Sequence, residues 1–138
     1  MATFRVRQAS VEDTDEVADV LREAAHWLED RGNPLWRDDE LRPDRLAAEV
    51  AAGVYFVGEG PQGIVATVRL QLEDTLFWPD SPPGEAAYMH RLAVRRNSAG
   101  GVVSSAMMQW AVDRMRVLGR QFLRLDCEAN RLRLRAVY

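Results

Sequence analysis

The chain of 138 residues contains no lysine and a single cysteine, Cys127. One cysteine excludes a disulfide within the chain, and chains without disulfides are typical of reducing compartments, so we expect a cytoplasmic protein. No apolar run approaches the roughly 18 residues of a membrane-spanning helix. The first ten residues, MATFRVRQAS, lack the apolar segment of a secretory signal. We therefore expect no membrane partner. Without a Cys/His cluster, we also expect no metal site.

Charges are unevenly distributed along the sequence. Residues 1–90 carry 18 acidic side chains against 8 arginines, whereas residues 91–138 carry 3 against 10. The balances of −10 and +7 sum to the net charge of −3. Every cation is a guanidinium, which binds phosphate through a fork of donors. The basic third of the chain therefore favours a small anionic ligand, although solvated helix faces explain many of these arginines equally well. A nucleic acid partner is not expected, because such domains are usually basic overall.

Hydrophobic residues make up 47% of the chain and charged residues 28%, a balance that excludes a disordered protein. Alternating residues predict strands near 4–8, 54–59, 63–73, 85–94 and 121–127. Helical spacing predicts helices near 13–30, 44–52 and 102–118, and another from Asn130. In the strand predicted near 4–8, Phe4 and Val6 are expected to point inward and Arg5 and Arg7 outward. The order β-α-α-β-β-β-α-β-α predicts an α/β fold with a mixed sheet, in one domain over residues 1–138.

The segment RRNSAGGVVSSAMMQW (95–110) places two glycines between a predicted strand and a helix. The N-terminus of a helix offers unsatisfied N–H groups and a positive dipole to an anion, and glycine lets a phosphate approach. Ser104 and Ser105 can add hydroxyl donors, and Arg95 and Arg96 can add counter-charge. An ordinary strand-to-helix connection explains the same glycines. The segment matches neither the P-loop nor the G-x-G-x-x-G pattern.

Together, HRLAVRRNSAGGVVSSAMMQWA and FLRLDCEANRLRLRAVY resemble the GNAT superfamily of N-acetyltransferases, and the resemblance covers essentially the whole chain. It implies a GNAT-like fold. It also implies an enzyme that moves an acetyl group from acetyl-CoA to a primary amine of a small molecule or peptide by direct attack. No metal is implied. A second interpretation stays open: a non-catalytic module with the same groove, which binds acyl-CoA or a partner.

The resemblance also implies which residues hold acetyl-CoA. The family's splayed strand corresponds to Leu92, Ala93 and Val94, whose main chain would contact the pantetheine arm and polarise the thioester. The family's phosphate arm, Q/R-x-x-G-x-G/A, falls on the segment Ala99, Gly100, Gly101, Val102, Val103 and Ser104. Ala99 stands where Gln or Arg is usual and Val102 where the first glycine sits, but main-chain donors do not depend on the side chain. Asn130 corresponds to an asparagine near the cofactor, one place out of register.

For catalysis, the resemblance implies that Tyr138 protonates the departing thiolate of CoA. His90 is our first choice for the base, because imidazole accepts a proton near neutral pH and the family often has Glu or His on this strand. Ordinary packing explains either residue equally well. The resemblance places the acceptor between the first helices and the loop before the LAV strand. The candidate wall residues there are Trp27, Trp36, Trp78 and Tyr88, with His26 and Phe77 beside them.

Family members usually continue beyond the Tyr helix with two more strands, whereas this sequence stops at Tyr138. We therefore expect either a C-terminally incomplete sequence or a second subunit that completes the sheet. Because an uncovered edge strand can pair with another chain, we expect a homodimer.

Overall fold

A computed structural model of the chain describes residues 4–30, 32, 41–61, 63–72, 84, 86–98 and 101–125. Its strands are β1 (Arg5–Gln8), β2 (Tyr55–Gly60), β3 (Gly63–Gln71), β4 (Ala86–Val94) and β5 (Phe122–Leu125). Its helices are α1 (Thr14–Asp30), α2 (Pro43–Ala51) and α3 (Val102–Val117), with short 3₁₀ turns η1 (Val11–Asp13) and η3 (Arg96–Ser98). This order agrees with the predicted one as far as β5. The helix predicted from Asn130 lies outside the described residues.

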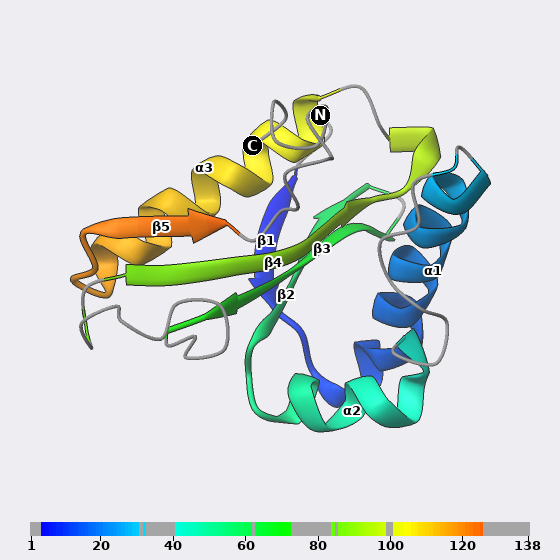
Figure 1. Cartoon of the computed structure of the whole chain (residues 1–138), viewed down its shortest axis with the longest axis horizontal. Helices are drawn as coiled ribbons and strands as arrows, with labels where there is room; N and C mark the ends of the chain where they lie inside the picture. Colours follow the sequence, from blue (N-terminus) through cyan, green and yellow to red (C-terminus); the bar gives the residue numbers. More distant parts are fainter. Residues whose placement is uncertain are drawn as a thin grey trace.

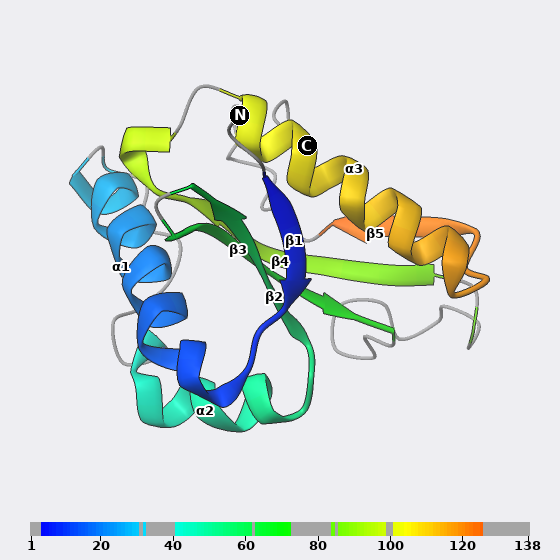
Figure 2. The same cartoon turned by 180° about the vertical axis from the view of Figure 1, so that it is seen from behind.

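The described strands form one sheet in the order β1-β2-β3-β4-β5. The first three pairings are antiparallel, and β4 pairs with β5 in parallel. A parallel pair needs a crossover connection, which α3 supplies. The helices α1 and α2 lie on one side of the strands and α3 lies on the other (Figures 1 and 2). The predicted α/β class with a mixed sheet is confirmed.

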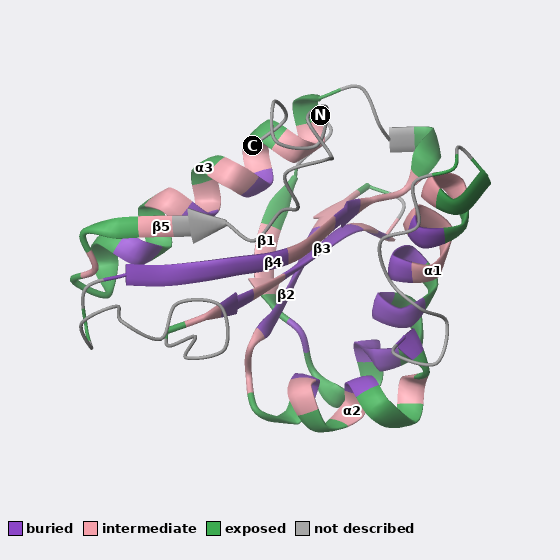
Figure 3. Ribbon diagram, viewed as in Figure 1, coloured by how far each residue is buried: buried purple, intermediate pink, exposed green. Residues whose placement is uncertain are grey.

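Each face of the sheet has its own apolar core. Val17, Leu21 and Leu46 from the helices pack with Tyr55 and Val57 on the α1/α2 face. On the opposite face, side chains of α3 pack against β2, β3 and β4; they include Met107, Ala111, Met115, Phe56, Val68, Leu70 and Met89. The buried stripe of α1 faces the strands in Figure 3, as the helical spacing of its apolar residues requires. None of the helices within the described ranges is long and apolar enough to cross a membrane.

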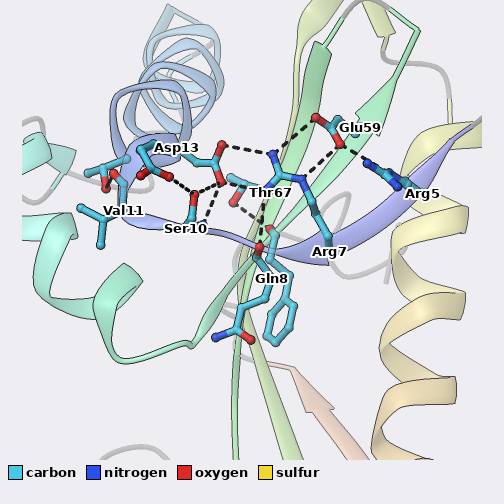
Figure 4. A network of polar contacts seen from close by, with 11 residues as sticks. Arg5, Arg7, Gln8, Ser10, Val11, Asp13, Glu59 and Thr67 are labelled. Atoms are coloured by element: carbon cyan, nitrogen blue, oxygen red, sulfur yellow. Dashed lines mark hydrogen bonds and ion pairs between the residues drawn. The ribbon is translucent and has the colours of Figure 1, made fainter.

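The junction between β1 and α1 is held by a network of polar contacts (Figure 4). The backbone N–H of Ser10 donates to the carboxylate of Asp13 at 2.8 Å, as a capping box requires. The guanidinium of Arg7 binds the same carboxylate at 2.7 and 3.1 Å and also binds Glu59 at 3.1 Å. Hydrogen bonding from Arg7 lowers the pKa of Asp13 to about 2. The pair thereby fixes the start of α1 against β1 and β2.

The predicted alternation of the first strand is present in β1, but the burial of two of its side chains differs from the prediction. Phe4 lies just before the strand and remains 36% exposed, although its ring lies beside Gly58 on the side of Met107, the same face as Val6. The side chain of Arg7, expected outside, is only 33% exposed. Its two carboxylate partners explain the difference, because a paired guanidinium can be partly buried at low cost.

Candidate active site

β4 contains a bulge. Arg69 of β3 is opposite His90, and Thr67 is opposite Ala93, so Val68 alone faces the two residues Arg91 and Leu92. Arg91 has φ +55°, and it is the one residue other than glycine with positive φ in the described part of the chain. Bulges that carry such a conformation are common beside active sites, where they change the direction of side chains.

The bulge changes which side chains of β4 reach each face. Before it, Tyr88 and His90 point to the α1/α2 face, and they are 1% and 3% exposed. After it, Leu92 and Val94 pack on the α3 face, and Ala93 returns to the α1/α2 core. Tyr88 and His90 therefore share one face of β4. It is the face of the sheet on which α1 and α2 pack.

The main chain of Val94 points away from β3. The N–H of Arg95 donates to the carbonyl of Val65 at 2.8 Å. Along an antiparallel pair, residues alternate between bonding to the neighbour and bonding away from it, so Val94 directs its N–H and C=O toward the opposite edge of β4. Described pairing with β5 covers only Ala86–Met89. Within the predicted segment Leu92–Val94, it is therefore Val94 whose N–H and C=O both point to the β5 side of β4.

The N-terminus of α3 has the features expected of a phosphate site. Gly101 is the N-cap with φ +97°, and it carries no side chain to accept the first N–H groups of the helix. The first intrahelical bond from this end is donated by Ser105 to the carbonyl of Gly101. Val102, Val103 and Ser104 therefore present the orphan N–H groups. A Cβ at Gly101 would meet no described atom within 4 Å, so none of the described side chains crowds this position.

Arg95 and Arg96, predicted as counter-charges for that phosphate, are directed toward α1. The guanidinium of Arg95 donates to Glu23 at 3.3 Å and to the carbonyl of Ile64 at 3.0 Å. The backbone N–H of Arg96 donates to Glu23 at 2.6 Å, and the guanidinium of Arg96 lies 3.9 Å from the centre of the Trp27 ring. These contacts fasten the turn after β4 onto the second half of α1. They also explain why Trp27 is only partly exposed.

Sequence reasoning missed a group of polar contacts on the α1/α2 face. Arg91 donates from Nη1 to the hydroxyl of the buried Tyr55 at 3.1 Å. Arg69 forms an ion pair with Glu49 of α2 at 3.1 Å. A signal was present in β3, where Thr67, Arg69 and Gln71 occupy alternate positions. Because alternate residues share a face, this spacing places a polar row inside the α1/α2 layer.

Several predicted site residues lie outside the described residues: Tyr138, Asn130, Trp36, Trp78, Ala99 and Gly100. Within the described ranges, no group of three or more His, Cys, Asp or Glu side chains is arranged to hold a metal ion. The described site therefore consists of the bulged β4, the N-terminus of α3, and the polar residues beside His90.

Comparison with known proteins gives consistent matches. The family model described as "Acetyltransferase (GNAT) family" matches residues 20–138. The chain is 30% identical to the uncharacterized N-acetyltransferase YesJ of Bacillus subtilis, over 98% of the chain and 78% of that protein. It is also similar to a crystal structure of a GNAT-family acetyltransferase from Listeria monocytogenes 4b F2365. That structure has a TM-score of 0.81 and 25% identity, over 98% of this chain and 83% of the other.

A more distant structure shares the fold and was solved with a ligand. The PaiA N-acetyltransferase of Thermoplasma acidophilum, in complex with coenzyme A, superposes with a TM-score of 0.75 at 14% identity. The match covers 99% of this chain and 87% of that one.

Proposed function

Because the chain belongs to the acetyltransferase (GNAT) family, we propose that it transfers the acetyl group of acetyl-CoA to a primary amine of a small molecule or peptide. The amine attacks the thioester directly. The observation that carries this proposal is the pairing of an open helix N-terminus at Gly101 with a bulged strand whose Val94 main chain points to the β5 side.

Main-chain groups are proposed to hold the donor. The orphan N–H groups of α3 suit the diphosphate of coenzyme A, because backbone donors and the helix dipole both favour an anion. The N–H and C=O of Val94 suit an amide of the pantetheine arm. The proposed contact residues are Leu92, Ala93, Val94, Ala99, Gly100, Gly101, Val102, Val103, Ser104 and Asn130. Acetyl-CoA supplies the activated acyl group, and no residue of the chain needs to be acylated.

His90 is proposed as the base. As the C–N bond forms and the C–S bond breaks, the amine loses a proton and the sulfur gains one. His90 takes the first proton, either directly or through a water molecule, and Tyr138 supplies the second. His90 lies on the same face of β4 as Tyr88, for which we propose a place in the acceptor wall with Trp36 and Trp78. For Trp27, whose ring contacts the guanidinium of Arg96, we propose instead that it supports the turn after β4.

We further propose that residues 1–138 act as one acetyltransferase domain in the cytoplasm, as a homodimer. β5 forms an edge of the described sheet, and an edge strand can pair with a second copy. Exposed apolar side chains precede and begin it: Val117 at the end of α3, Leu118 directly after α3, and Phe122 at the start of β5. Sedimentation equilibrium measures the assembly; a monomer at micromolar concentration contradicts the dimer alone.

A thiol-release assay with acetyl-CoA and a panel of amines tests the proposed function. Turnover with at least one amine is expected, together with large losses in His90→Gln and Tyr138→Phe at unchanged coenzyme A affinity. The chain has no lysine, so acetylation of its own lysine side chains cannot contribute to the released thiol. Coenzyme A binding without turnover for any amine supports the non-catalytic module instead. Absence of binding contradicts both interpretations.

A further inference from the structure

Three side chains form a row across the α1/α2 face of the sheet. Tyr55 of β2 is directly opposite Arg69 of β3, and Arg69 is directly opposite His90 of β4. Directly opposite residues of antiparallel strands point to the same face, with Cβ atoms about 4.5–5.5 Å apart. A guanidinium therefore extends from the position next to the proposed base.

Arg69 is held in place and still has donors to offer. Its Nη1 donates to Glu49 at 3.1 Å, which fixes the side chain against α2. Its Nε is buried and has no hydrogen-bond partner in the described part of the chain. The side chain as a whole is 17% exposed, so a ligand can reach part of it. A guanidinium carries five N–H donors, so donors other than the one bound to Glu49 remain for a further acceptor at the exposed part of the side chain.

A second guanidinium approaches the same point. Arg91, at the bulge, donates to the hydroxyl of Tyr55 at 3.1 Å. Burial raises the pKa of Tyr55, while the charges of Arg91 and Arg69 lower it and that of Glu49 raises it. Both arginines are therefore close enough to this hydroxyl to act on it. The face of the sheet beside His90 is accordingly a place where positive charge converges.

We propose that the acceptor of this enzyme is a small amino carboxylate, such as an amino acid, and that Arg69 binds its carboxylate. This inference rests on the proposed function. A guanidinium matches a carboxylate with two parallel hydrogen bonds, and its one strong partner here, Glu49, occupies one nitrogen. With the carboxylate on Arg69, the amine of the same small molecule lies on the side of His90.

The same charges favour reaction of such an acceptor. A nearby guanidinium disfavours the ammonium form of the amine, so it raises the fraction of the neutral, nucleophilic form. An amine without an acid group would bring only its positive charge to this face, where Arg69 and Arg91 repel it and Glu49 is the described carboxylate that attracts it. The carboxylate of an amino acid offsets this repulsion, so the site selects acceptors that carry an acid group.

Matched sets of acceptors test the proposal. Each set contains an amino acid, its amide and its decarboxylated amine, and kcat/KM is measured for each with saturating acetyl-CoA. We expect the amino acid to exceed both analogues by roughly tenfold or more, because a site built for an acid group leaves its donors unpaired with the analogues. In Arg69→Gln the KM for the amino acid rises and this preference falls to about twofold or less, while the KM for acetyl-CoA is unchanged.

Arg116→Gln, an exposed arginine of α3 on the other side of the sheet, is the matched control and should keep the full preference. If Arg69→Gln does not fold, the comparison of acceptors with the unmodified protein decides the question alone. Analogues that react as fast as the amino acids, or an Arg69→Gln variant with an unchanged preference, overturn the proposal and leave the acetyltransferase function intact. Failure to bind coenzyme A would instead overturn the proposed function, and the inference with it.

Discussion

The guanidinium of Arg96 lies over the ring of Trp27, 3.9 Å from its centre. Glu23, one turn earlier on α1, accepts the backbone N–H of Arg96 at 2.6 Å. From the sequence, Trp27 was predicted in the wall of the acceptor site and Arg96 as a counter-charge for the phosphate of the donor, which are separate parts of the site. Their contact instead connects the helix beside the acceptor to the turn that leads into α3. That turn is where the proposed donor site begins.

This contact predicts that α1 supports donor binding. Trp27→Leu and Arg96→Gln should each raise the KM for acetyl-CoA about two- to fivefold, the equivalent of roughly 0.5–1 kcal/mol for a cation–π pair. The double variant should lose no more than the larger single loss, since both substitutions remove one interaction. Steady-state kinetics with each substrate varied in turn measures the effect. A rise confined to the KM of the acceptor would restore Trp27 to the acceptor wall.

Two glycines at the ends of α3 provide a matched comparison. Gly101 and Gly119 have φ of +97° and +77°, and a Cβ on either would meet none of the described residues within 4 Å. Alanine at either position should lower stability by about 1–3 kcal/mol through backbone strain. Only Gly101→Ala should also weaken coenzyme A binding, by roughly tenfold, because its methyl group and altered backbone face the proposed phosphate. Thermal unfolding and isothermal titration separate the two effects. Equal affinity in both variants contradicts the placement of the phosphate.

The Arg7–Asp13 pair predicts how stability depends on acid. The pKa of Asp13 falls from 3.8 in the unfolded chain to about 2 in the folded protein, first of all through hydrogen bonding to Arg7. Because the folded value is the lower one, the stabilisation is complete above the unfolded value and is lost as pH falls through the folded one. It amounts to about 2 kcal/mol.

Urea unfolding of the original protein and Asp13→Asn checks this window. The variant should be about 2 kcal/mol less stable at about pH 5, and the gap should close below about pH 2. Asp15→Asn, which removes an exposed carboxylate from the first turn of α1, should leave the pH dependence unchanged. A gap of constant size at every pH would mean that Asp13 acts by packing alone.

Gly58 of β2 predicts a stability effect on the α3 face. A Cβ there would lie 2.6 Å from Cζ of Phe4 and 2.8 Å from Sδ of Met107, closer than side chains pack. Gly58→Ala should therefore cost about 1–3 kcal/mol by forcing both side chains to move. Gly60→Ala, on the same strand with nothing within 4 Å of the added methyl group, should change stability by less than about 0.5 kcal/mol. Chemical unfolding of both variants measures the difference.

Local chemistry made much of the fold predictable. The strands predicted near 54–59 and 85–94 and the helix predicted near 102–118 are set by residues a few positions apart, and each is found close to where the pattern placed it. Leu-, Val- and Ala-rich spacing likewise predicted the buried stripe of α1. Such features need no knowledge of the partner element, which is why sequence reasoning reaches them.

The details of the site depend on contacts between distant segments and could not be predicted in the same way. The bulge at Arg91 arises from the register of β4 against β3, and arginine is not a residue that favours φ +55°. Arg95 and Arg96 turn toward α1 because Glu23, more than seventy residues earlier, accepts from both. Nothing in the segment RRNSAGG itself distinguishes the direction toward α1 from one toward the N-terminus of α3.

The extra residue in β4 also sets a rule for comparing or grafting this strand. Up to His90, even-numbered positions face α1 and α2; beyond Arg91, the odd-numbered Ala93 does. In a relative whose strand lacks the extra residue, one half of the strand alternates in the opposite sense. An alignment by residue type alone then pairs positions whose side chains lie on opposite faces of the sheet. Replacing the part of β4 up to His90 therefore requires replacing the paired part of β3 as well. The part beyond Arg91, with its main-chain contacts, can then stay unchanged.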